Sequence, residues 1–200
     1  MKSIYASLLL ITVGAIELKL IADSEITNSV AEDSSGSGDP KKVDVDESTG
    51  LRFPELNFEL QEIPESCVQI KPADAGSDAN LAFAHTLSGT KIHIYAEQDP
   101  SIRKFNADDI IAMRKKWVLQ KDSKAKITTE KECIIADLSG KEFQASFGII
   151  LPIDTHFGIK VLIYKDFAYQ IVVVSNNKDT CSKLLNEFSK SFKLLKIRPE

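Results

Sequence analysis

The sequence is poor in cysteine and has no large excess of either charge. Its 200 residues include three cysteines, and the formal net charge is −4. The spacing of Cys67, Cys133 and Cys181 fits no zinc-binding pattern, and three cysteines cannot all pair within one chain. Two roles stay open for Cys133, a disulfide with Cys67 or a buried strand position, and Cys181 is expected on the apolar face of a helix.

A basic domain is also missing. Residues 51–200 carry 21 basic and 20 acidic side chains. Proteins that bind nucleic acid present a clearly basic domain or stripe, and neither a glycine-rich phosphate loop nor a set of stacking aromatic residues is found here. We therefore expect no nucleic-acid partner.

Motifs that would identify an enzyme are absent as well. No Gly-x-Ser-x-Gly elbow surrounds Ser146 or Ser175, the two serines considered as nucleophiles. Asp154 and His156 are two residues apart in a loop expected over Pro152–Phe157, and that spacing alone does not make a relay. We expect no catalytic activity and no cofactor, and a hydrolase is the third of the functions considered.

The first 22 residues resemble an export signal. Lys2 gives a positive start, Ile4 to Val13 is apolar, and small residues suited to cleavage follow, with the cut after Ala15 or Ala22. Charged residues interrupt the run before the ~20 apolar residues that a membrane span needs. We expect a protein exported to the periplasm, cell envelope or extracellular space; the alternative is an amphipathic helix of a cytosolic protein.

Residues 23–50 are expected to be an acidic, disordered linker. A stretch of small polar residues, Ser34 to Pro40, lies at its centre, and the acids around it cannot bury enough surface to fold. Its charged residues are eight acids against Lys41 and Lys42: Asp23, Glu25, Glu32, Asp33, Asp39, Asp44, Asp46 and Glu47. A single domain is expected over residues 51–200.

The first half of that domain is expected to hold short strands and a hairpin. Strands are predicted at Leu56–Leu60 and Cys67–Ile70, and a hairpin at Leu81–Leu87 and Lys91–Glu97. A three-residue loop, Ser88 to Thr90, would pair Ala84 with Ile94 and Phe83 with Tyr95. Both faces of the hairpin are then partly apolar, which predicts that other layers cover the sheet on both sides.

Two helices and further strands follow. Asn106 is a good N-cap for a helix with Ile110, Met113 and Trp117 on one face, and Asn176-Asn177 opens a second helix. The other predicted elements are strands at 125–129, 132–137, 142–150, 158–164 and 167–174, a turn at 138–141, a hairpin turn at 165–166, and a short apolar tail that returns to the sheet. The fold class is α+β, an antiparallel β-sheet sandwiched by α-helices.

This order of elements resembles the MOG1/PsbP-like superfamily over roughly residues 53–197. The resemblance is carried by the opening strand Phe58 to Leu60, the hairpin end Ile94 to Pro100, the strand Tyr169 to Val173 and the closing segment Ser189 to Phe192. It implies an α/β/α sandwich and a non-catalytic binding or assembly module. Members include a photosystem II subunit, a Ran-binding protein and bacterial envelope proteins, and the export signal indicates an exported bacterial member of unassigned role.

Candidate partner-binding residues come from exposure and charge. A group of basic residues gathers at the end of the first helix: Arg114, Lys115, Lys116 and Lys121, with Lys124 and Lys126 beyond them. They could bind a phosphate, an anionic lipid headgroup or an acidic partner, or they are a solvated helix end that offsets the helix dipole. Asp154 and His156 are added from the exposed loop. The favoured partner is a protein of the envelope or the extracellular space, with no transmembrane segment in the mature chain.

A metal site is considered on the hairpin. His85 and His93 would be cross-strand neighbours across a three-residue loop, with Glu97 close by, and could hold zinc or copper. A two-residue loop would place the histidines on opposite faces and remove the site. The alternative function is accordingly a carrier of a small ligand, either a lipid or a metal.

Overall fold

The computed structural model describes residues 50–150 and 153–195. The expected export signal at 1–22, and the expected linker apart from Gly50, lie outside these residues. Within them, no helix is both long and apolar enough to cross a membrane.

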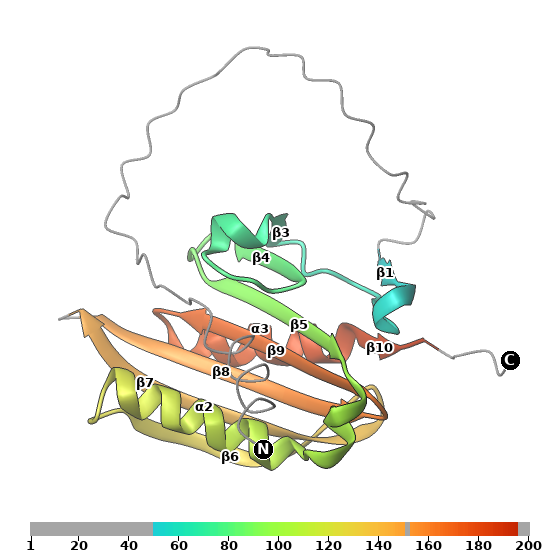
Figure 1. Ribbon diagram of the computed structural model, residues 1–200. Coiled ribbons are helices and arrows are strands. Elements are labelled where there is room, and N and C mark those ends of the chain that lie inside the picture. The colour runs from blue at the N-terminus through green and yellow to red at the C-terminus, as the bar shows by residue number, and fades with distance from the viewer. Residues whose placement is uncertain (1–49, 151–152, 196–200) are drawn as a thin grey trace, which may run out of the picture.

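A seven-stranded antiparallel sheet forms the centre of the fold (Figure 1), with the strand order β3-β4-β5-β9-β8-β7-β6. Every neighbouring pair in this order is antiparallel. The strands are β3 (Cys67–Ile70), β4 (Leu81–His85), β5 (Lys91–Gln98), β6 (Lys126–Ile135), β7 (Leu138–Ile150), β8 (Ile153–Tyr164) and β9 (Phe167–Ser175). The β-branched and aromatic residues that fill β8 and β9 suit a strand with two buried faces.

The two long helices of the described chain lie on opposite faces of this sheet (Figure 1). α2 (Ala107–Lys121) packs on β7 and β8, and α3 (Lys178–Ser191) packs on β8 and β9. Asn106 and Asn177 cap the two helices as N-cap residues, and Asn106 forms a reciprocal capping box with Asp109. The predicted α+β sandwich is confirmed.

Alternation along the strands divides the apolar residues between two cores. On β9, Ile171 and Val173 point towards α3, and Ala168 and Val172 point towards the opposite face. The α3 helix contributes the predicted stripe of Cys181, Leu184, Leu185 and Phe188, all buried. The prediction that both faces of the sheet are covered is therefore confirmed.

A second, three-stranded sheet closes one end of the domain, in the order β1 (Leu51–Phe53), β2 (Phe58–Leu60) and β10 (Phe192–Leu194). The apolar tail thus pairs with β2 rather than with the main sheet, as a correction to its predicted place. Phe58 stacks on Phe192 with ring centroids 5.0 Å apart, and Tyr169 of β9 packs edge-on against both rings. Short 3-10 helices complete the fold: η1 (Pro54–Leu56), η2 (Pro72–Ala75) and η3 (Pro100–Lys104).

Several predicted boundaries are wrong at the turns. The segments 125–129 and 132–137 form one strand, β6, with a bulge between Ile127 and Thr129. The turn into β7 lies at Ala136-Asp137, both with positive φ, rather than at 138–141. The predicted Pro152–Phe157 loop is also wrong, because β8 begins at Ile153 and pairs with β7 from there.

The register of the β4–β5 hairpin also differs from the prediction. Ala84 pairs with Lys91 rather than with Ile94, and Phe83 pairs with Ile92 rather than with Tyr95. The His85 N–H donates to the Thr90 carbonyl at 2.8 Å, so that four residues, rather than three, form the loop. One additional loop residue reverses which side chains of the two strands share a face.

Candidate functional site

Arg114 does not belong to an exposed patch, as a correction to its predicted place. Arg114 is 3% exposed. Its guanidinium donates to the side-chain oxygen of Gln170 on β9, from Nε at 3.2 Å and from Nη2 at 2.8 Å. The guanidinium carbon also lies 5.8 Å from the centre of the Tyr95 ring, a cation–π distance. Burial lowers the pKa of Arg114 below its usual value, and Tyr95 and Asp78 act against this shift. Arg114 therefore anchors α2 on the sheet.

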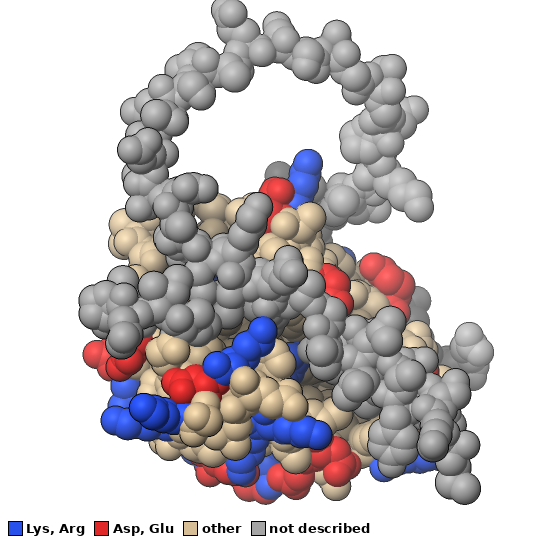
Figure 2. Space-filling model, turned by 60° about the vertical axis from the view of Figure 1, so that its left-hand side comes forward, with Lys and Arg blue, Asp and Glu red and all other residues tan. Residues whose placement is uncertain are grey.

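The lysines at the C-terminal end of α2 are accessible. Lys115 forms an ion pair with Glu130 of β6 at 2.7 Å, and Lys116 and Lys121 are exposed. Lys124 and Lys126 extend this group beyond the helix. We call these five lysines the α2 lysine surface. Figure 2, which brings the left-hand side of Figure 1 forward, shows basic side chains gathered on this side of the molecule with some acidic ones between them.

Asp154 lies at the same end of the sheet as this surface. The Asp122 carboxylate, just after α2, accepts from the Gly148 N–H of β7 at 3.1 Å, and Gly148 pairs with Asp154 of β8. Phe157 of β8 packs in the core below α2. Because successive side chains of a strand point to opposite faces, Asp154 and His156 are nevertheless directed to the face that carries α3. The two predicted groups are close along the sheet but face opposite sides.

The two histidines considered for a metal lie on opposite faces of the sheet. His93 pairs with Ala82, which is three positions before His85 on β4. His85 Nδ1 lies 2.8 Å from the Ser88 hydroxyl, within the hairpin loop. The cross-strand pair on which the metal site rested is therefore wrong, and the described residues contain no group of three His, Cys, Asp or Glu side chains placed to hold a metal ion.

His93 has an unusual environment. It is 2% exposed, and its Nδ1 has no hydrogen-bond partner among the described residues. Burial, followed by the nearby charges of Lys91 and Arg114, lowers the pKa of His93 from 6.5 to about 4. The imidazole is consequently neutral near pH 7.

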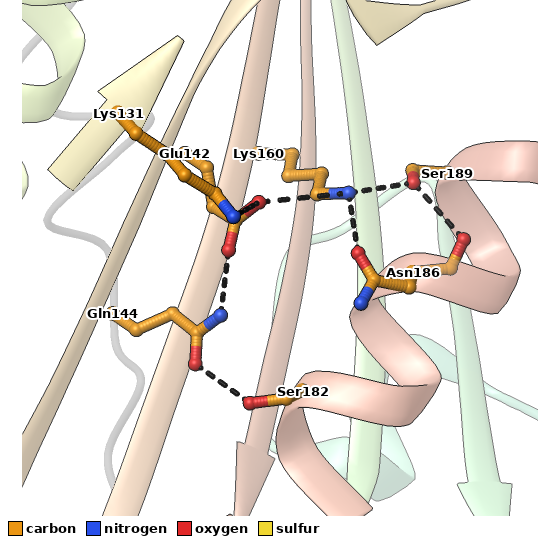
Figure 3. A network of polar contacts seen from close by, with 7 residues as sticks. All are labelled: Lys131, Glu142, Gln144, Lys160, Ser182, Asn186 and Ser189. Carbon is orange, nitrogen blue, oxygen red and sulfur yellow. Dashed lines mark hydrogen bonds and ion pairs between the residues drawn. The ribbon is translucent and has the colours of Figure 1, made fainter. Parts of the chain in front are cut away.

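A buried polar network joins β7 and β8 to α3, on the face of the sheet that α3 covers (Figure 3). Lys160 Nζ of β8 donates to Asn186 Oδ1 at 2.8 Å and to Ser189 Oγ at 2.9 Å, and lies 3.7 Å from Glu142 Oε2 of β7. The side chains of Lys160 and Glu142 are 7% and 4% exposed. This pair is the most deeply buried ion pair in the described part of the chain.

The network continues through Gln144 to a second point on the helix. Gln144 Nε2 donates to Glu142 Oε1 at 2.7 Å, and Ser182 Oγ donates to Gln144 Oε1 at 2.9 Å (Figure 3). Lys131, on the exposed side, lies 3.8 Å from Glu142 Oε2. The network thus holds α3 at two points separated by nearly two turns, which fixes the position of the helix on the sheet.

The polar groups of this network do not form a nucleophile and its base. Glu142 and Lys160 are engaged with each other and with neutral side chains. The nearby Cys133 is a free thiol, and burial raises its pKa, which favours the unreactive protonated form. Cys67 and Cys181 are also free and buried, and burial raises their pKa values to about 11 and about 12.

Neither buried charge was predicted, although the sequence contains a signal for each. Arg114 lies four residues after Ile110 and four before Val118, on the apolar stripe of α2. Lys160 stands between Ile159 and Val161 and is the one charged residue in the β-prone run from Gly158 to Tyr164. A charged residue at such a position is expected inside the protein and needs a polar partner there.

Comparison with known proteins identifies the fold, but it finds no relative that is close in sequence. No protein-family model matches the chain, and no curated protein matches it. Among solved structures, cyanobacterial PsbP (CyanoP) from Synechocystis aligns with a TM-score of 0.54 at 12% identity, over 78% of this chain and 98% of its own. The Ran-binding protein Mog1p of Saccharomyces cerevisiae aligns with a TM-score of 0.52 at 9% identity, over 73% of this chain and 94% of its own.

These two structures place the chain among proteins with the MOG1/PsbP-like fold, as its sequence predicted. The alignments cover nearly the whole of both known proteins, so the shared part is the complete sandwich rather than a fragment. At this level of identity the likeness concerns the fold alone.

Proposed function

We propose that this protein is a non-catalytic, exported binding module, and that it docks to a protein of the cell envelope or extracellular space through the α2 lysine surface. The observation that carries the proposal is the position of these lysines: several exposed cations lie together on one end of a rigid sandwich. The buried charges of Arg114, Glu142 and Lys160 are engaged within the fold, whereas these lysines are accessible to a partner. Export rests on the expected signal at residues 1–22.

The structural neighbours are consistent with a binding role. Mog1p is a Ran-binding protein, and its fold is shared by this chain. A partner for the α2 lysine surface would present carboxylates, since exposed lysines attract acidic surfaces and increase the rate of encounter with them. Lys115 already engages Glu130, so Lys116, Lys121 and Lys124 are the residues with most to gain from a partner.

Native mass spectrometry of the protein recovered gently from its own cells tests the function first. A protein-sized added mass would support docking and identify the partner, and a lipid-sized addition would instead support the carrier function. The mass missing from the N-terminus would report whether the export signal is cleaved.

Charge reversal then tests the surface. A variant with Lys116, Lys121 and Lys124 changed to Glu should bind the recovered partner at least about tenfold more weakly, because attraction becomes repulsion at three positions. The matched control reverses three lysines that are exposed elsewhere, Lys71, Lys178 and Lys190, and should retain binding. Equal binding by both variants would refute the assignment of this surface.

A further inference from the structure

The α2 lysine surface combines positive charge with exposed apolar area. Leu119 of α2 is 43% exposed, and Ala112 and Lys116 precede it by seven and three residues, so that all three lie on the outer side of the helix. Lysine stems bury well along such apolar surface while their charged ends stay in water. A ligand for this surface therefore needs carboxylates and a few aliphatic side chains.

We propose that the chain's own acidic segment, Asp23–Asp33, docks on the α2 lysine surface and competes there with an acidic partner. The competition rests on the proposed function, whereas the docking itself does not. The segment would then act as an internal, low-affinity occupant that an external partner has to displace.

The composition of this segment matches the surface. It carries four acids, Asp23, Glu25, Glu32 and Asp33, and no base, and it includes the aliphatic residues Ile26 and Val30. The other half of the expected linker is less suited, because Lys41 and Lys42 lie among its four acids. Charge complementarity thus favours the half of the linker that is farther from the folded domain.

The chain is long enough for this contact. Asp33 precedes Gly50, where the described structure begins, by 17 residues, which reach about 55 Å when extended. A compact domain of this size is roughly 38 Å across. The acids of Asp23–Asp33 can therefore reach the C-terminal end of α2 even though β1, which follows Gly50, lies towards the other end of the molecule in Figure 1.

The expected contact is weak and salt-dependent. Each exposed ion pair contributes little, but tethering raises the effective concentration of the segment to the millimolar range. Physiological salt screens such charges beyond about 8 Å, so docking should weaken steadily as salt is added. A weak tethered occupant is suited to displacement by a partner with more carboxylates.

Carbodiimide crosslinking of the full chain tests the docking directly, because this reagent joins carboxylates to lysines that touch them. Mass spectrometry should locate crosslinks from Asp23, Glu25, Glu32 or Asp33 mainly on the α2 lysine surface, and 1 M salt should remove them. Crosslinks spread evenly over the lysines of this surface and the exposed control lysines Lys71, Lys104, Lys178 and Lys190 would overturn the proposal.

A matched pair of full-length variants tests the competition, with a fluorescent 20-residue polyglutamate peptide as the probe. One variant changes the four acids of Asp23–Asp33 to their amides, and the control changes the four acids nearer the domain. The control carries four substitutions: Asp39→Asn, Asp44→Asn, Asp46→Asn and Glu47→Gln. Both lose four negative charges, but only the first should bind the probe about three- to tenfold more tightly. Equal tightening in both would overturn specific docking.

The two proposals fail in different ways. If crosslinks do not favour the α2 lysine surface but its charge reversal still abolishes partner binding, the internal occupant is refuted and the docking function stands. If the crosslinks do favour the surface but partner binding survives charge reversal, the internal occupant stands and the proposed partner surface is refuted.

Discussion

Removing one charge of the buried Glu142–Lys160 pair should destabilise the protein far more than removing the exposed charge beside it. The Lys160→Met change keeps a long apolar stem in place but leaves Glu142, 3% exposed, without its buried cation. The other groups that contacted Lys160 keep alternatives, because Asn186 is exposed to water and the Ser189 hydroxyl still donates to the Asn186 carbonyl at 3.0 Å. The change therefore isolates the cost of an uncompensated carboxylate.

The magnitude follows from how much of the charge stays unpaired. Breaking a buried ion pair by removing one partner costs about 3–5 kcal/mol. Gln144 still donates to Glu142, and Lys131 lies 3.8 Å away with its side chain 60% exposed, so the lower end of that range, about 3 kcal/mol, is expected. The control Lys131→Met removes only the exposed cation and should cost less than about 1 kcal/mol.

Urea unfolding at pH 7 measures these free energies. A double variant, Glu142→Gln with Lys160→Met, removes both charges and should be within about 1 kcal/mol of the wild type, because no buried charge then lacks a partner. The added Glu142→Gln change should thus restore about 2 kcal/mol relative to Lys160→Met alone. If Lys160→Met costs no more than Lys131→Met, the argument that this network holds a buried charge is refuted.

Three further changes test the local structure. Asn106→Ala removes the cap whose oxygen accepts from the Asp109 N–H at 3.0 Å, and should lower the free energy of unfolding by about 1 kcal/mol in urea; no change would argue against this cap. Gly140→Ala places a methyl group 2.5 Å from the Val161 carbonyl oxygen, a backbone atom that cannot yield, and should cost roughly 1–3 kcal/mol by thermal unfolding, so a neutral result would contradict the close strand contact. The pKa of His93 is lowered from 6.5 to about 4 in the folded state, so the unfolded state binds more protons between these values, and the free energy of unfolding should fall by roughly 3 kcal/mol as pH drops from 6.5 to 4. A His93→Gln variant should lose that part of the pH dependence. An identical pH profile in both proteins would refute the assignment.

Much of the fold could be predicted because its local signals agree with its tertiary packing. The α3 stripe, Cys181 to Phe188, repeats at helical spacing, and Asn106 is followed by Asp109 as a capping box requires. The β8–β9 hairpin combines two strongly β-prone runs with the two-residue turn Lys165-Asp166, where Lys165 has positive φ. In each case one short segment contains all the information that determines its structure.

The wrong predictions concern a loop length and a turn position, and both depend on segments distant in the sequence. The β4–β5 loop holds four residues because Ile92 and Ile94 have to face the α3 core while His93 and Tyr95 face the other side, and this choice is made by β9 and the two helices. The turn at Ala136-Asp137 requires positive φ at two residues other than glycine, whereas Gly140, the residue that favoured a turn, is needed within β7 for a close approach to Val161. Glycine at that place serves strand packing rather than turning.

The candidate site illustrates the same division between local and distant information. Lys116 could be placed on a surface from helix periodicity alone, but Arg114 could not be separated from the lysines by charge, since its partner Gln170 is 56 positions away. The decisive feature is the phase of the helix: Arg114 shares the stripe of Ile110 and Val118, whereas Lys116 lies half a turn from it. Reversing Arg114 together with the lysines would therefore disrupt the core as well as the surface, and any loss of binding in such a variant would report unfolding. Charge reversal at the exposed lysines alone is the change that separates a docking surface from the buried residue that holds its helix in place.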